Sequence, residues 1–184
     1  MTYIDYIEYF KNLSVQHPEM CHEDKKGKEI FMLKTWEDNL GEYRSTIQEK
    51  SYLFTLLDPT ITQEHSRLND ECCVIFEGAF IISHYHSDRK EGIDSFVSAK
   101  EKSYQVLKQI ENRMFEDART DQGVFNGCKI TYCDELVRSI SPMDCIGDTN
   151  YSGWMMVFQI KITDLNIGCH APETGWKDGW EASA

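Results

Sequence analysis

The stretch of residues 71–119 constrains the fold most, because its hydrophobic period changes from that of a strand to that of a helix. It opens as ECCVIFEGAFIISHYHS, in which apolar side chains occupy both alternating sets of positions. Alternate residues of a strand point to opposite faces of a sheet, so this pattern predicts a strand covered on both sides for much of its length. Gly78 interrupts the alternation and predicts a bend or a bulge.

After the polar turn SDRKEG, apolar residues recur mainly at steps of three and four. This spacing is typical of an amphipathic helix and predicts a long helix directly after the strand. Such a pair needs neighbouring strands and a sheet surface for the helix to cover. The inward stripe of the helix is predicted to comprise Ile93, Phe96, Val97, Tyr104, Leu107, Ile110 and Met114.

Shorter elements are predicted before this stretch. An N-terminal helix begins at Thr2 and ends before Pro18, because the residue before proline avoids helical backbone angles. The linker PEMCHEDKKGKE that follows is polar and is predicted to be exposed. Residues 30–33 form a strand or the lead-in to a turn, and a short helix is predicted from Trp36. The apolar stripe of the N-terminal helix comprises Tyr3, Tyr6, Ile7, Phe10 and Leu13.

Three further strands are predicted. Residues 52–57 (YLFTLL) form a buried strand that Asp58-Pro59 stops, and the polar connection TITQEHSRLND joins it to the central strand in a long-looped hairpin. Residues 127–137 form another strand, which the turn-rich segment SISPMDCIGDTN ends. In SGWMMVFQIKI the large apolar residues share one face, which is typical of an antiparallel strand with one buried face. They are Trp154, Met156, Phe158, Ile160 and Ile162.

This order of elements predicts a single α+β domain over residues 1–163. A mostly antiparallel sheet is packed by the N-terminal helix and by the long crossing helix. The chain has 184 residues, enough for one domain with a substantial core. Residues 164–184 show no hydrophobic period and carry Trp176 and Trp180 among glycines and acids. We interpret them as a C-terminal arm that docks on its own domain or on a neighbour, with a frayed tail as the alternative.

The formal net charge of −12 argues against non-specific nucleic-acid binding, which requires clustered lysine and arginine. The seven cysteines include no CxxC pair, and we expect them to be reduced and to act as small apolar residues. The sequence has no apolar run long enough to cross a membrane, and MTYIDYIEYF lacks the plan of a signal peptide. We therefore expect folding in the cytoplasm of the cell that makes the protein.

The sequence offers no constellation that we would assign to catalysis, to a cofactor or to a metal. A glycine-rich phosphate loop, a GxSxG motif and an HExxH motif are absent. His84 and His86 share a strand face and are the best metal candidates, but the two Cys-His dipeptides of the chain lack the usual ligand spacing. We expect a protein that is not an enzyme, and a small metal-dependent enzyme that uses this histidine pair stays as an alternative.

Several phrases resemble one family of proteins. TYIDYIEYFKNLSVQHP, GAFIISHYHSD, IENRMFEDAR and NYSGWMMVFQIKI are similar to small proteins of phages and prophages of Bacteroides-type bacteria. Those proteins resemble the tail-terminator or tail-completion class of tailed bacteriophages. The resemblance covers most of residues 2–163, and it rests on element order and short phrases. The linker at residues 21–29 and the tryptophan-bearing arm depart from the pattern and leave the position in the neck open.

The resemblance implies a structural virion protein of the phage neck, a subunit of a homo-oligomeric head-to-tail connector ring. Its partners would be portal or connector proteins and tail proteins, with DNA passing through the lumen without specific binding and no contact with a membrane. It would be made in the cytoplasm of the bacterial host. Acidic subunits around a lumen would repel DNA phosphates. The alternative is an acidic intracellular binding or immunity-type module for a basic protein.

For the ring, we predict contacts between subunits instead of catalytic residues. Trp176 and Trp180 are the candidate anchors in a groove of the neighbour, because buried aromatic side chains dominate many interfaces. The loop of residues 87–92, with Asp88, Arg89 and Lys90, is a further candidate, as is the linker of residues 21–29.

Overall fold

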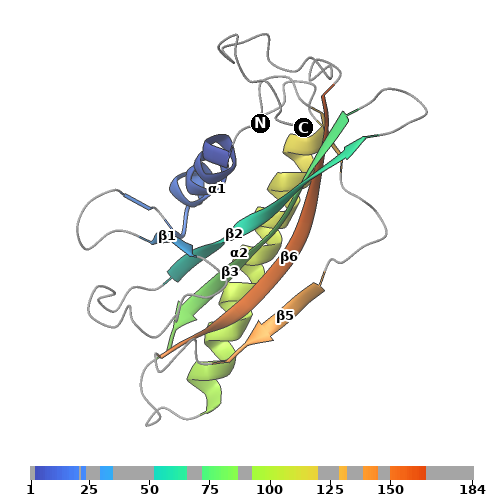
Figure 1. The fold of residues 1–184 in the computed structure, drawn as a ribbon. Coiled ribbons are helices and arrows are strands. Elements are labelled where there is room, and N and C mark those ends of the chain that lie inside the picture. The colour runs from blue at the N-terminus through green and yellow to red at the C-terminus, as the bar shows by residue number, and fades with distance from the viewer. Residues whose placement is uncertain are drawn as a thin grey trace, which may run out of the picture.

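The computed structural model describes residues 3–20, 22–23, 30–34, 52–65, 72–86, 93–119, 129–131, 139–144 and 150–164. Within these residues two helices lie against one twisted sheet, so the predicted α+β class is confirmed (Figure 1). The helices are α1 (Tyr3–Gln16) and α2 (Ile93–Arg119). The strands are β1 (Phe31–Lys34), β2 (Tyr52–His65), β3 (Cys72–Tyr85), β4 (Lys129–Thr131), β5 (Ser139–Met143) and β6 (Tyr151–Asp164).

The sheet is mostly antiparallel, as predicted. Its described strands follow the order β1-β2-β3-β6-β4, and β5 also pairs with β6. The pair β1–β2 is parallel and the others are antiparallel. β4 and β5 lie one after the other along the same edge of β6, opposite its end and its beginning respectively. The strands β2, β3 and β6 have 14 residues each, so each spans about 46 Å.

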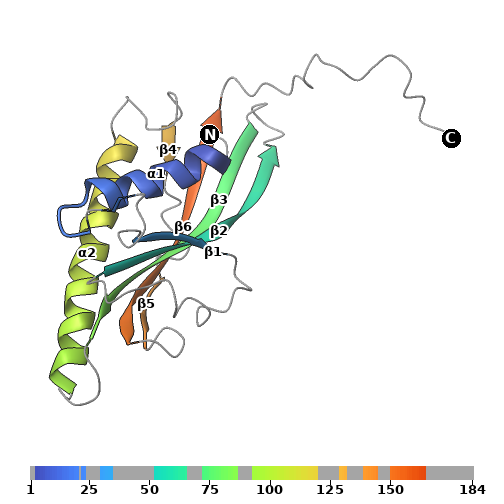
Figure 2. The same cartoon turned by 90° about the vertical axis from the view of Figure 1, so that its left-hand side faces the viewer.

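Both helices cover the same face of the sheet (Figure 2). The ring of Phe10 in α1 is central to this core, because its centroid lies 5.2 Å from that of Phe158, 5.9 Å from that of Phe80 and 6.3 Å from that of Phe54. One aromatic side chain therefore contacts the three central strands, and such tilted and edge-to-face packing stabilises a core beyond the area it buries. From α2 the core receives Val106, Leu107, Ile110 and Met114.

The opposite face of the sheet carries a smaller apolar cluster. Leu53, Ile81 and Tyr151 form its buried part. On β3, Ile81 faces this cluster, whereas its neighbours Phe80 and Ile82 belong to the helix-covered core. The prediction that this strand is covered on both sides is therefore confirmed for its second half, where Ala79 and Ile81 are buried, whereas Glu77 on the same face is exposed.

β2 is longer than predicted, because Asp58 and Pro59 do not end it. These two residues face the single residue Gly78 of β3, where the register shifts between Leu57 and Thr60. The arrangement is a β-bulge, which tolerates proline because the extra residue leaves the ladder of hydrogen bonds. The bulge predicted at Gly78 thus lies on the partner strand. The segment predicted as a polar connection is a strand as far as His65, and the hairpin of β2 with β3 is confirmed.

The prediction of a turn over SISPMDCIGDTN is wrong for its first part. Residues Ser139–Met143 form β5, which pairs antiparallel with the beginning of β6. Pro142 lacks a backbone N–H and favours turns, but it is compatible with a strand at the edge of a sheet. Of the strand predicted over residues 127–137, the structure describes only β4.

The predicted inward stripe of α2 is partly wrong. Leu107, Ile110 and Met114 are buried as predicted, but Ile93, Val97 and Tyr104 are 75%, 55% and 37% exposed. In α1 the prediction is wrong at two positions. Tyr3 is 39% exposed, whereas Tyr9, which the pattern omitted, is buried. Spacing alone does not tell which side of a broad apolar surface meets the sheet.

The linker after α1 is not exposed throughout. His22 is buried, and its Nδ1 accepts hydrogen bonds from the backbone N–H groups of Ile30 and Phe31 at 2.9 and 3.2 Å. These bonds fix the start of β1, so the apolar run at residues 30–33 belongs to a strand. The short helix predicted from Trp36 lies outside the described residues. Neither described helix is long and apolar enough to span a membrane.

Candidate functional site

The five residues predicted to contact partners lie outside the described residues. They are Trp176, Trp180, Asp88, Arg89 and Lys90. Their roles therefore remain predictions, and so do those of the linker and of the 87–92 loop as a whole.

The histidine pair at the end of β3 packs against aromatic rings. The ring of His84 lies edge-on to that of Tyr52 at 4.7 Å, and its Nδ1–H donates to the carbonyl of Tyr85 at 2.6 Å. Burial lowers the pKa of His84, because it disfavours the charged imidazolium, and the hydrogen bond to Tyr85 opposes this shift only in part. His84 is therefore held neutral over a wider pH range than a free histidine.

His86 occupies a similar environment two residues further on, just after the end of β3. Its ring lies 5.7 Å from that of Phe96 in α2, and its Nε2 is buried without a hydrogen-bond partner among the described residues. In the same part of the chain, histidine, cysteine and acidic side chains nowhere gather in a group of three that could hold a metal ion. The described contacts of the pair are with aromatic rings and with the backbone.

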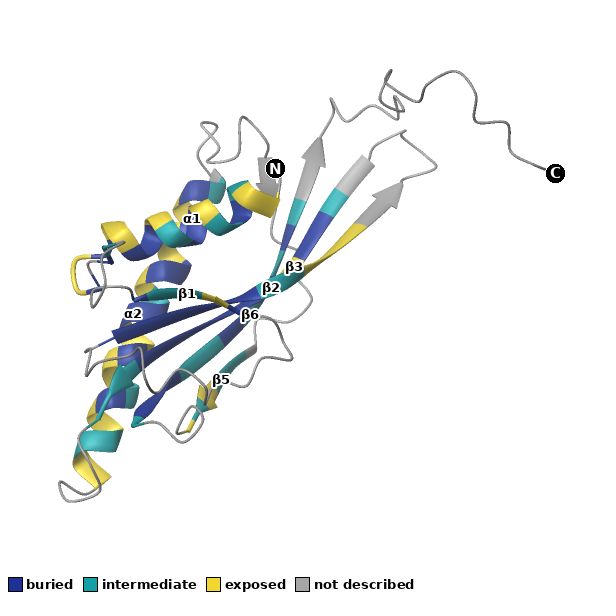
Figure 3. Cartoon of the chain, turned by 60° about the vertical axis from the view of Figure 1, so that its left-hand side comes forward, coloured by how far each residue is buried: buried dark blue, intermediate teal, exposed yellow. Residues whose placement is uncertain are grey.

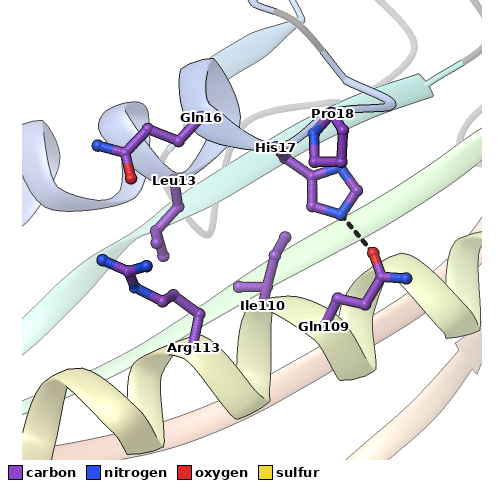
Figure 4. A pocket seen from close by; sticks show the side chains of 7 residues that line it. All are labelled: Leu13, Gln16, His17, Pro18, Gln109, Ile110 and Arg113. Carbon is purple, nitrogen blue, oxygen red and sulfur yellow. Dashed lines mark hydrogen bonds between the residues drawn. The ribbon is translucent and has the colours of Figure 1, made fainter.

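A pocket of about 190 Å³ lies between α1 and α2 (Figure 4). Leu13, Pro18 and Ile110 give it an apolar floor, while Gln16, His17, Gln109 and Arg113 give it a polar rim. Figure 4 shows the side chains of both helices pointing toward one another across this space.

The polar rim of this pocket joins the two helices. Nδ1 of His17 accepts from the backbone N–H of Glu19 at 3.2 Å, so Nε2 carries the proton and donates to Oε1 of Gln109 at 2.7 Å. Nε of Arg113 donates to Oδ1 of Asp117 at 2.9 Å, and the Tyr9 hydroxyl donates to Oδ2 of the same carboxylate at 3.1 Å. We interpret the pocket as a clamp between the helices, because His17, Gln109 and Arg113 of its rim form hydrogen bonds within the chain.

A second, more open hollow of about 480 Å³ lies between the first half of α2 and strands β5 and β6. We call it the α2 groove. Its apolar lining includes two of the exposed residues of α2, together with one residue each from β5 and β6. The full lining is Val97, Lys100, Glu101, Tyr104, Ile140 and Trp154.

The sheet is open at both edges within the described residues. On one side, β1 pairs with β2 only over Phe54, Thr55, Leu56 and Leu57, so the second half of β2 has a single described partner, β3. On the other side, β6 is paired in two pieces, by β4 and by β5. Figure 3 shows the ends of β2, β3 and β6 extending beyond the helices. Open edges are places where a sheet can add strands of another chain.

Sequence reasoning missed the α2 groove and the helix clamp for different reasons. The spacing of Ile93, Val97 and Tyr104 was a usable signal for a second apolar stripe, since the three residues lie to one side of the buried positions. The clamp had no sequence signal, because His17 and Gln109 come from segments far apart in the chain.

No known family model matches the chain, and a search of curated proteins finds no match.

Proposed function

We propose that the protein is a structural subunit of a ring in the neck of a tailed phage, of the tail-terminator or tail-completion kind that its sequence resembles. The ring would join the head connector to the tail and let DNA pass. The observation that carries this proposal is the open sheet, whose two described edges differ from each other.

Unlike edges favour a ring over a two-fold dimer. If the β2 edge of one subunit meets the β4 and β5 edge of the next, the contact is head-to-tail, and such contacts close into rings when the rotation between subunits is suitable. The main-chain groups of both edges supply the hydrogen bonds. The side chains at the end of β2 fit an interface that forms after folding, because Thr60, Ile61 and Thr62 are exposed in the single chain.

Charge supports the same proposal. A subunit with a formal net charge of −12, repeated around a ring, creates a negative field along the lumen. This field keeps DNA phosphates from adhering to the wall, so that the genome can pass.

Electron microscopy of the purified full-length protein tests the proposal. We expect closed annuli of one diameter, and we expect the protein in purified virions from the induced prophage. A strict monomer that is also missing from virions would refute it. A monomer that forms a stoichiometric complex with one basic, non-viral protein would instead support the acidic binding module.

A further inference from the structure

α2 carries a second apolar stripe that the fold itself does not use. Ile93, Val97 and Tyr104 lie outside the core and are exposed, in contrast to Val106, Leu107 and Ile110 of the same helix. The α2 groove continues this stripe onto the sheet through Ile140 and Trp154. A contiguous apolar patch that is exposed to solvent marks an interaction site.

The floor of the α2 groove is already ordered. The rings of Tyr104 and Trp154 lie 5.1 Å apart, and Nε1 of Trp154 donates to the backbone carbonyl of Lys100 at 3.0 Å. The Lys100 ammonium forms an ion pair with Asp144 and lies 4.8 Å above the ring of Phe96. Because these side chains are fixed before binding, an occupant that fills the groove costs little conformational entropy on this side.

The chemistry of the lining indicates which segment would fill it. Its charges are balanced, because Lys100 forms an ion pair with Asp144 and the other charged lining residue is Glu101. Its other lining residues are apolar or aromatic, namely Val97, Tyr104, Ile140 and Trp154. Residues 165–184 carry two large aromatic side chains, Trp176 and Trp180. The groove therefore matches this segment through apolar and aromatic contacts.

The length of the chain favours a neighbouring copy over the same copy. In the register of β3 with β6, Trp154 lies opposite Ile82 and Asp164 opposite Cys72, so the start of the C-terminal segment is about 33 Å along the strand from the groove. The twelve residues from Asp164 to Trp176 span at most about 43 Å. Docking within one copy would require these residues to reverse direction and run back along β6 at about three quarters of their full extension. A neighbour in a ring carries no such constraint.

We propose that the α2 groove receives residues 165–184 of a neighbouring copy, with Trp176 and Trp180 as the anchors. This inference rests on the proposed ring and names the contact that locks adjacent subunits.

A mixing experiment with two full-length variants tests the docking. Trp176→Ser/Trp180→Ser removes the anchors and leaves the groove, while Val97→Glu blocks the groove and leaves the anchors. Val97 is exposed, so the second variant should fold. Val15→Glu, on the exposed side of α1, is the matched control.

Native mass spectrometry then measures how tightly each variant dimerises. We expect each variant alone to associate roughly tenfold or more weakly than wild type, and the control to match wild type. Mixing the two variants restores one intact contact, so the mixed dimer should be about tenfold tighter than either variant's own dimer. A mixed dimer no tighter than these, while wild type still assembles, overturns the docking and leaves the ring standing. A wild-type protein that does not self-associate instead overturns the ring.

Discussion

The two halves of β2 belong to one strand but have different surroundings. Every residue of its first half, residues 52–57, is buried, between the helix-covered core, the second apolar cluster and β1. In its second half, Thr60, Ile61 and Thr62 are exposed (Figure 3). The bulge at Asp58 and Pro59 separates the halves. One continuous strand can therefore serve the stability of the subunit at one end and contact with another subunit at the other.

The largest effect is expected from a change that breaks the buried half. Phe10→Ala removes the ring that touches all three central strands and leaves a cavity there, so the free energy of unfolding should fall by about 3–5 kcal/mol. Urea denaturation followed by circular dichroism measures the loss. Val15→Ala, on the exposed side of the same helix, should change stability by less than about 0.5 kcal/mol. Equal losses in the two variants would contradict the assignment of the core.

The boundary between the halves can be tested at Gly78. A Cβ added there would lie 2.2 Å from the Tyr6 hydroxyl oxygen and 2.9 Å from Cζ of Phe158. Because both side chains are buried, Gly78→Ala should cost about 2–3 kcal/mol through overpacking.

A second substitution identifies which contact causes that loss. The Tyr6 hydroxyl is buried and has no hydrogen-bond partner among the described residues, so Tyr6→Phe alone should be close to neutral. In the double variant Tyr6→Phe/Gly78→Ala the shorter contact disappears and the one with Phe158 remains, so part of the stability should return. Additive losses in a double-mutant cycle would show that Tyr6 is not the obstacle.

A smaller effect on the free energy of unfolding is expected from the protonation of His84, near the end of β3. The pKa of His84 is lowered in the folded protein, chiefly by burial, with Lys102 and His86 adding in the same direction and Tyr85 and Glu19 opposing. The unfolded chain then binds the proton first, so the stability that neutral His84 provides is present above pH 6.5 and is lost progressively as pH falls below that value toward the lower pKa of the folded state. His84→Gln should flatten the stability profile between pH 7.5 and 5.5. An unchanged slope would place the titration elsewhere.

The sequence predicted the elements whose hydrophobic period is clear. β3, α2 and β6 match the predicted strand, helix and strand, because each has a regular pattern over more than ten residues. The sequence did not predict the second half of β2 or any part of β5 as strand, because proline usually ends a strand or favours a turn. Pro59 sits in a bulge and Pro142 on an edge strand, and both exceptions depend on the pairing partner.

The candidate surfaces were harder to predict than the fold. Val97 and Tyr104 were assigned to the core because their spacing fits an inward stripe, but the sheet reaches only one side of this helix. The helix clamp depends on His17 and Gln109, which are distant in sequence and meet only after folding. The predicted anchors Trp176 and Trp180 lie outside the described residues, so their test is experimental.

The oligomeric state of an edge variant tests the account most directly. Ile61→Lys places a charge on the exposed end of β2, where Ile61 is 44% exposed, and Val15→Lys adds the same charge to α1. Sedimentation equilibrium should find rings for wild type and Val15→Lys and monomers for Ile61→Lys, with the unfolding free energy of the monomers changed by less than about 0.5 kcal/mol. Rings that persist in Ile61→Lys, or monomers in all three proteins, would contradict assembly through the open edge of the sheet.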